Sequence, residues 1–278
     1  LQSWPGTVLS SHKSAGQHYH KLAFLADLGL TSEDPGIADL LERVLTHLSG
    51  EGFPMLPMVI SSSHGGNGEE TWAWALCDAP TTLYALAKMG YKEDSRVLKG
   101  RDFLLSLARD NGWPCAVSKS LGNFRGPGKK EDPCPYATLI ALKSLALYED
   151  TSRSGAAWAG VEALLELWAN SRTRHPYIFY MGTDFRKLKA PFIWYDLLHV
   201  LDVLSQFEYA LPDDRFQDML ACALEKADGD GLFTPESIWQ PWKDWDFGQK
   251  KRPSLWMTFL IQRIVKRAGI SEKGSALI

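Results

Sequence analysis

Lysine and arginine gather in three short segments of this chain, each just before a long apolar run. The segments contain Arg125, Lys129 and Lys130; Arg186, Lys187 and Lys189; and Lys250, Lys251 and Arg252. The N-terminus of a helix carries partial positive charge and unpaired N–H groups, so cations placed there favour a concentrated anion such as a phosphate, diphosphate or carboxylate. A single loop lysine is more often simply solvated. The recurrence of the pattern nevertheless predicts an anion site at these helix starts.

Aromatic side chains occupy the same regions. The chain has 11 Trp, of which Trp194, Trp242 and Trp245 lie close to the cationic segments, and Tyr136 stands at the start of an apolar run. Cations beside ring faces suit a ligand with a charged head and an apolar body. We therefore predict a small anionic, partly apolar molecule as the ligand. The alternative is that the rings fill the protein's own core.

Three carboxylates are candidates for acid chemistry. Asp244 and Asp246 form a close pair, and Asp196 lies near the start of the fourth apolar run. Burial or a neighbouring carboxylate raises the pKa of such a group toward the range in which it donates a proton at neutral pH. The alternative for the pair is structural, with its carboxylates capping a helix or binding nearby lysines.

A repeat positions these residues. Pro80, Pro135, Pro191 and Pro253 each stand at the head of an apolar run, and a fifth run without the proline begins at Tyr19. Proline is well tolerated in the first turn of a helix, and runs that are apolar on nearly all sides are typical of buried helices. Amphipathic stretches alternate with them, at 37–48, 96–108, 156–169 and 213–227.

This alternation predicts an all-α fold with one domain over residues 1–278, namely an α/α toroid of about five helical hairpins with inner and outer rings of helices. Since every repeat runs the same way, the inner helices would present their N-termini and the cationic loops at one end of the ring. A cavity at that end is where we expect the ligand.

At the level of repeats, nearly the whole chain resembles the superfamily of terpene cyclases and protein prenyltransferase β subunits, whose shared fold is an α/α toroid with a central apolar cavity. The sharpest local likeness runs from Gly112-Trp113-Pro114 to Asp132-Pro133-Cys134-Pro135-Tyr136. Prenyltransferase β subunits have a similar loop, then an Arg and a Lys that serve the isoprenoid diphosphate, then an Asp-x-Cys that supplies zinc ligands. The resemblance implies diphosphate contacts from Arg125 and Lys129, and zinc ligands in Asp132 and Cys134.

The same resemblance implies a third zinc ligand, a His at the start of a later inner helix. His199 is the candidate, although it comes one turn late and Asp196 stands nearer the family's position. The alternatives are a Cys134 that packs as a small apolar side chain and a His199 bonded to a backbone carbonyl in the core. Zn is the one cofactor that the resemblance suggests.

Composition narrows the classes of function. Lys+Arg 30 against Asp+Glu 33 gives a net charge of -3, so the chain has no overall basic excess for nucleic-acid binding. No apolar run reaches the roughly 18 residues that span a bilayer, and no leader segment is recognisable. Four Cys without a CxxC pair favour reduced thiols. These features predict a cytoplasmic protein without a transmembrane segment.

Three functions stay open at the level of sequence. The first is an enzyme, or a remnant of one, that binds or converts an isoprenoid diphosphate. The second is a carbohydrate-active toroid that cleaves an acidic glycan with a carboxylate pair such as Glu69/Glu70 or Asp244/Asp246. The third is a non-catalytic toroid that binds a ligand or a protein partner.

Overall fold

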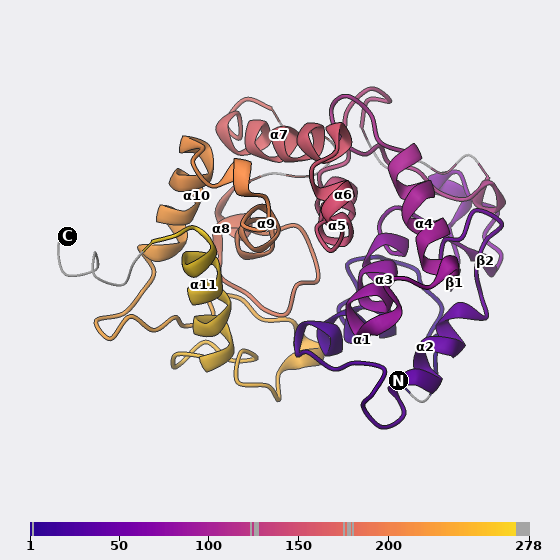
Figure 1. Cartoon of the computed structure of the whole chain (residues 1–278), viewed down its shortest axis with the longest axis horizontal. Coiled ribbons are helices and arrows are strands. Elements are labelled where there is room, and N and C mark those ends of the chain that lie inside the picture. Colours follow the sequence, from indigo (N-terminus) through magenta and orange to yellow (C-terminus); the bar gives the residue numbers. More distant parts are fainter. Residues whose placement is uncertain are drawn as a thin grey trace. The chain divides into compact units, whose positions relative to one another are not determined.

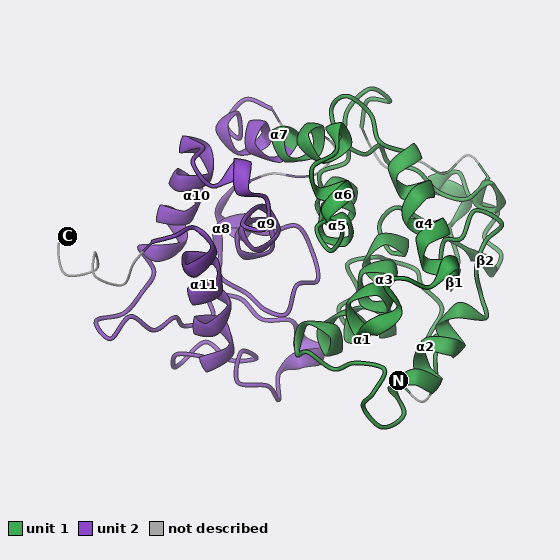
Figure 2. Ribbon diagram, viewed as in Figure 1, with its two compact units in different colours: residues 1–163, 176–178 green, residues 164–175, 179–278 purple. Residues whose placement is uncertain are grey.

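Helices dominate the structure, a computed structural model that describes residues 1, 3–122, 124, 128–174, 176, 179 and 181–270 (Figure 1). The chain divides into two compact units (Figure 2). Unit 1 consists of Leu1–Ala163 and Pro176–Ile178, and unit 2 of Leu164–His175 and Phe179–Ile278. The boundary falls inside one helix, α7 (Gly155–Ala169). The broad all-α class is confirmed, whereas the single domain and the five-repeat toroid stay predictions.

Unit 1 is built around three apolar helices, α1 (His18–Asp27), α3 (Ala79–Leu86) and α5 (Pro135–Leu145). Helix α3 packs against both α1 and α5 (Figure 1). Every residue of α3 and of α5 is buried, which explains why the sequence has almost no polar face there. Pro80 and Pro135 lie in the first turns of these two helices, as the sequence predicts.

Even the lysine of α5 is buried. Lys143 Nζ lies 3.1 Å from Asp27 Oδ2 at the end of α1 and 4.5 Å from the centre of the Tyr84 ring in α3. The Tyr84 hydroxyl also donates a hydrogen bond to Asp27 Oδ1. A buried charge requires partners of this kind, so one ion pair with its hydrogen bond connects the three helices.

Unit 1 also contains α2 (Ile37–Leu45), α4 (Ser95–Ser106), α6 (Glu149–Ser152), β1 (Leu56–Met58) and β2 (Thr71–Ala73). Helix α4 packs against α3 and α5. The strands β1 and β2 pair antiparallel, with Leu56 opposite Ala73. No strand is predicted in that region, because three-residue strands carry too little alternation to be recognised in a sequence.

Unit 2 contains α8 (Thr183–Arg186), α9 (Leu197–Leu204), α10 (Asp214–Leu224) and α11 (Leu255–Arg267). Helix α9 is entirely buried and packs against α10 and α11 (Figure 1). It begins at Leu197 and not at Pro191, where the proline pattern predicts its start. The reason is a side-chain cap, in which Asp196 Oδ1 accepts a hydrogen bond of 3.1 Å from the backbone N–H of His199.

The five apolar helices share one property at their starts. The residue that caps each N-terminus is buried in every case: Gln17, Asp78, Cys134, Asp196 and Ser254. The chemistry of each helix start therefore depends on the side chains that enclose it. In the part of the chain that the structure describes, no helix is both long enough and apolar enough to cross a membrane.

Candidate functional site

A basic pocket in unit 2 is the strongest candidate for a binding site. It has a volume of about 710 Å³. Four cations line it against one carboxylate, Glu236: Arg172, Arg186, Lys187 and Lys226. Apolar and small residues complete the wall: Met181, Gly182, Ser171 and Thr183. The pocket therefore combines an excess of positive charge with some apolar surface.

Three separate segments of the chain deliver the cations. Arg172 follows the end of α7, Lys226 follows the end of α10, and Arg186 and Lys187 lie at the end of α8. In an antiparallel helical hairpin, the end of the outer helix lies at the same side as the start of the inner helix. Cations that follow outer helices can therefore join those that precede inner helices.

The Arg186 guanidinium is held by an aromatic ring. Its central carbon lies 4.8 Å from the centre of the Trp168 ring in α7, a distance typical of a cation–π contact. The Trp168 indole in turn donates a 2.8 Å hydrogen bond to Asp218 Oδ2 of α10. The ring that supports Arg186 is thus fixed between two helices.

Glu236 is the carboxylate of the pocket lining and pairs with Lys226. Its Oε2 accepts hydrogen bonds from Lys226 Nζ at 2.7 Å and from the backbone N–H of Leu188 at 2.8 Å. Lys226 and Glu236 also line a second pocket of about 520 Å³ together with Lys250. Lys250 therefore lies beside the ion pair of Lys226 with Glu236, which also lines the basic pocket.

Lys189, the third predicted cation of its segment, points away from solvent. The residue is buried, and its Nζ lies 3.3 Å from Asp184 Oδ2 and 5.2 Å from the centre of the Trp239 ring. Lys187 Nζ lies 3.8 Å from Asp184 Oδ1. The Asp184 carboxylate therefore sits between the surface lysine and the buried one.

Asp196 is the most perturbed acid of unit 2. It is fully buried, and its Oδ2 accepts no hydrogen bond from any residue that the structure describes. Burial raises the pKa of the Asp196 carboxyl to about 7, against the opposing charge of Lys189 and the hydrogen bond from the His199 N–H. The group consequently exchanges its proton near neutral pH, which suits a general acid.

Aromatic rings surround this helix start. The Phe192 ring stacks on His199 with centres 4.8 Å apart, and Phe179 stands 5.6 Å from Trp194 and 5.4 Å from Tyr195. His199 Nδ1 lies 2.9 Å from the Trp194 carbonyl oxygen, so this nitrogen carries the proton and donates it. His199 therefore makes the hydrogen bond to a backbone carbonyl that the sequence analysis gives as its structural alternative.

The predicted acids Asp244 and Asp246 differ in their surroundings. Asp244 is exposed. Asp246 Oδ2 accepts hydrogen bonds from Ser254 Oγ at 2.8 Å and from the Trp256 backbone N–H at 3.1 Å. Asp246 thus supports the start of α11, which matches the capping role considered for this pair.

The other predicted residues of unit 2 belong to the loop before α11. The Trp242 and Trp245 ring centres are 6.1 Å apart, and Trp245 stacks on Phe247 at 5.7 Å. Trp242 and Phe247 are buried, as core-filling rings are. The cations of this loop are all exposed: Lys250, Lys251 and Arg252.

In unit 1, some of the residues predicted to bind a diphosphate or zinc lie at the surface, and others lie in the core. Lys129 and Lys130 are exposed, Asp132 is half-buried, and Arg125 lies outside the described residues. Cys134 is buried, and its backbone N–H donates to the Trp113 carbonyl oxygen at 2.7 Å. Tyr136 is fully enclosed as well, and burial raises the pKa of its hydroxyl.

The thiol of Cys134 has a thiol partner rather than a set of metal ligands. A hydrogen bond with Cys77 lowers the pKa of the Cys134 thiol, against the effect of burial. Among the described residues, no group of three or more His, Cys, Asp or Glu side chains is placed to hold a metal ion. The zinc site implied by resemblance, with Asp132, Cys134 and His199, therefore gains no support from this part of the chain.

Sequence reasoning missed two features. Arg172 and Lys226 were not selected, although one follows the amphipathic stretch at 156–169 and the other lies at the end of the stretch at 213–227. Asp78 was not selected either, yet its buried Oδ2 lies 2.8 Å from His12 Nε2 in unit 1. Both features depend on which segments meet in space, and one sequence does not contain that information.

Comparison with protein-family models and with curated proteins gave no match. The features of the molecule that indicate a function are the helical fold, the basic pocket and the perturbed carboxyl of Asp196.

Proposed function

We propose that unit 2 binds a small anionic ligand with an apolar part, of which an isoprenoid diphosphate is the best-fitting class. The observation that carries this proposal is the convergence of Arg172, Arg186, Lys187 and Lys226 on one pocket beside a single carboxylate. A volume of about 710 Å³ falls within the range of small-molecule sites.

Each cation of the pocket would contact an anionic head group in a different way. Arg186 offers a planar fork that binds two oxygens at once, and its contact with Trp168 keeps that fork in place. Lys187 adds a compact charge, and Lys226 is oriented by Glu236. Met181 supplies apolar surface for the body of the ligand.

We include in this proposal that the chain is related to terpene cyclases and prenyltransferases and that its helices form a closed toroid of five repeats. Asp196 favours catalysis in addition to binding. A buried carboxyl with a pKa of about 7 and an Oδ2 without a hydrogen bond is partly protonated at neutral pH, which is the state that a general acid requires. Asp184 pairs with both Lys189, whose charge acts on this acid, and Lys187 of the basic pocket.

Calorimetric titration with farnesyl diphosphate, inorganic pyrophosphate and farnesol tests the binding proposal. We expect binding of farnesyl diphosphate, weaker binding of pyrophosphate and none of farnesol alone. The double variant Arg186→Ala/Lys187→Ala removes two charge-assisted contacts and should weaken binding about 100-fold, at roughly tenfold for each. Lys243→Ala, an exposed lysine outside both pockets, is the matched control and should bind as the unaltered protein does.

Two results would overturn the proposal. One is the absence of binding by all three compounds, and the other is equal affinity in the double variant and the control. Catalysis is tested separately by product analysis after incubation with the diphosphate, in which Asp196→Asn should bind normally and form no product. Binding without product in the unaltered protein would leave the ligand-binding function and remove the catalytic one.

A further inference from the structure

Helix α11 exposes large apolar side chains along one face. Leu255 is 77% exposed, Phe259 50% and Ile270, just beyond the helix, 39%. With Gln262 and Lys266, which are also exposed, they follow a spacing of three to four residues. Within α11, which ends at Arg267, side chains with this spacing lie on one side of the helix, and Ile270 follows in the segment after it. A continuous strip of the surface is therefore apolar in part and carries positive charge.

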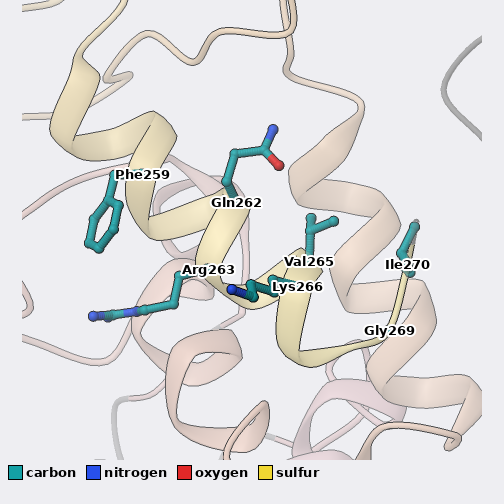
Figure 3. A pocket seen from close by; sticks show the side chains of 7 residues that line it. All are labelled: Phe259, Gln262, Arg263, Val265, Lys266, Gly269 and Ile270. Atoms are coloured by element: carbon teal, nitrogen blue, oxygen red, sulfur yellow. The ribbon is translucent and has the colours of Figure 1, made fainter. Parts of the chain in front are cut away.

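A shallow groove of about 620 Å³ follows this face. Figure 3 shows Phe259, Gln262, Arg263, Val265 and Lys266 projecting from the helix and Ile270 from the segment that follows it. The Arg263 guanidinium lies 5.6 Å from the centre of the Phe259 ring, and the Trp256 ring stacks on Phe259 with centres 5.4 Å apart. Aromatic rings at the edge of a basic groove are typical of membrane-interface surfaces.

The charge of this region has one sign. From Gly248 to Ile270 the sequence has no Asp or Glu and six cations: Lys250, Lys251, Arg252, Arg263, Lys266 and Arg267. Two of them are held by the buried carboxylate of Asp202, at 2.7 Å from Arg263 and 3.0 Å from Arg267. The other four are exposed, and three of these directly precede the helix.

We propose that this face of α11 docks on the surface of an anionic lipid bilayer. Leu255, Phe259 and Ile270 enter the boundary between headgroups and acyl chains, as the apolar face of an interfacial helix does. Lys251, Arg252 and Lys266 face the lipid phosphates, where each cation strengthens binding about fivefold. The proposal is independent of the ligand proposed for the basic pocket.

Charge complementarity favours this occupant over a second copy of the chain. In a symmetric pair, each copy would bring its own exposed cations to the same patch, and like charges repel at an interface. An anionic bilayer offers the opposite charge over its whole surface and accepts apolar side chains that protrude singly.

Co-sedimentation of the full chain with vesicles tests the proposal. We expect binding to phosphatidylcholine vesicles that contain phosphatidylserine and at least tenfold weaker binding to pure phosphatidylcholine. Added salt should weaken the interaction, whereas added inorganic phosphate at constant ionic strength should not compete. Leu255→Ser/Phe259→Ser should abolish binding, and Lys251→Glu/Lys266→Glu should reduce it at least 25-fold, at about fivefold for each cation removed.

Matched controls are Leu28→Ser and Lys243→Glu, which alter an exposed leucine and an exposed lysine elsewhere and should bind as the unaltered protein does. Thermal unfolding of each variant confirms that it is folded. Absence of binding to anionic vesicles, equal binding to both vesicles or equal loss in the controls would overturn the proposal. Competition by free phosphate would assign the cations to a phosphate site instead. A dimer seen by light scattering that Leu255→Ser/Phe259→Ser dissociates would assign the face to a second copy.

Discussion

Asp78 in unit 1 and Asp196 in unit 2 occupy the same position at the start of a buried helix and have different surroundings. Both are fully buried N-cap residues. Asp78 Oδ2 lies 2.8 Å from His12 Nε2 and accepts a hydrogen bond of 3.2 Å from the backbone N–H of Ala75. Asp196 uses only Oδ1 for its cap, and Oδ2 accepts no hydrogen bond from the described residues.

The N-cap position of a buried helix therefore does not by itself determine the pKa of an aspartate. Burial raises the pKa of the Asp78 carboxyl, but the hydrogen bond and the charge of His12 oppose the shift. For Asp196 the opposing effects come from the charge of Lys189 and from backbone N–H groups, and the pKa rises to about 7. The first carboxylate is a structural partner of a histidine, whereas the second is able to exchange a proton at neutral pH.

The largest expected effect comes from removing the two carboxylates. Asp78→Ala leaves His12 and the Ala75 N–H without their buried acceptor, so the free energy of unfolding should fall by about 3–5 kcal/mol. Asp196→Ala loses a helix cap worth about 1–2 kcal/mol but also removes the cost of ionising a buried carboxyl, so it should lower the free energy of unfolding much less than Asp78→Ala does. Urea denaturation of both variants at neutral pH measures this difference. Equal losses would contradict the distinction between a partnered and an unpartnered acid.

The pH dependence of stability tests the raised pKa of Asp196. Between its ordinary pKa and about 7, the folded protein holds a proton at Asp196 that the unfolded chain releases. Asp196 therefore stabilises the fold at low pH. The free energy of unfolding falls by up to roughly 4 kcal/mol as the pH rises toward 7. Asp196→Asn keeps the cap without titrating, so the variant should lack this loss. Parallel stability curves for the two proteins from pH 4 to 8 would show that the pKa is ordinary.

A smaller effect of opposite sign is expected in unit 1. His20 Nε2 lies 3.0 Å from the His12 carbonyl oxygen, and burial lowers the pKa of His20 to about 3. Below about pH 6.5 the unfolded chain binds a proton at His20, whereas the folded protein does not. The free energy of unfolding therefore falls as the pH drops, by about 2 kcal/mol between pH 6.5 and 5.

His20→Gln keeps a donor near the His12 carbonyl and should be less sensitive to acid over that interval. Denaturation at each pH compares the variant with the unaltered protein. The two units would then respond oppositely, with His20 weakening unit 1 in acid and Asp196 weakening unit 2 toward neutral pH. An identical pH dependence in His20→Gln would contradict the shifted pKa of His20.

The sequence predicted the helices better than it predicted the site. The apolar runs at 79–86 and 135–145 are buried helices with a proline in the first turn, because a helix enclosed on all sides needs apolar side chains throughout. The start of α9 was predicted at Pro191 and lies at Leu197, since the local proline pattern is weaker than the side-chain cap of Asp196. Of the predicted cations, Arg186 and Lys187 line the basic pocket, while Lys129, Lys130, Lys251 and Arg252 are exposed.

By itself, the sequence determined the helical class, the alternation of buried and amphipathic helices and the places where cations gather, because these depend on residues close together in the chain. Only the tertiary structure decided that Arg172 and Lys226 join Arg186 and Lys187, and that Asp196 is enclosed with one oxygen lacking a hydrogen bond. A pocket and a pKa both depend on which distant segments exclude water from a group. That exclusion arises when the chain packs, so no local pattern of residues contains it.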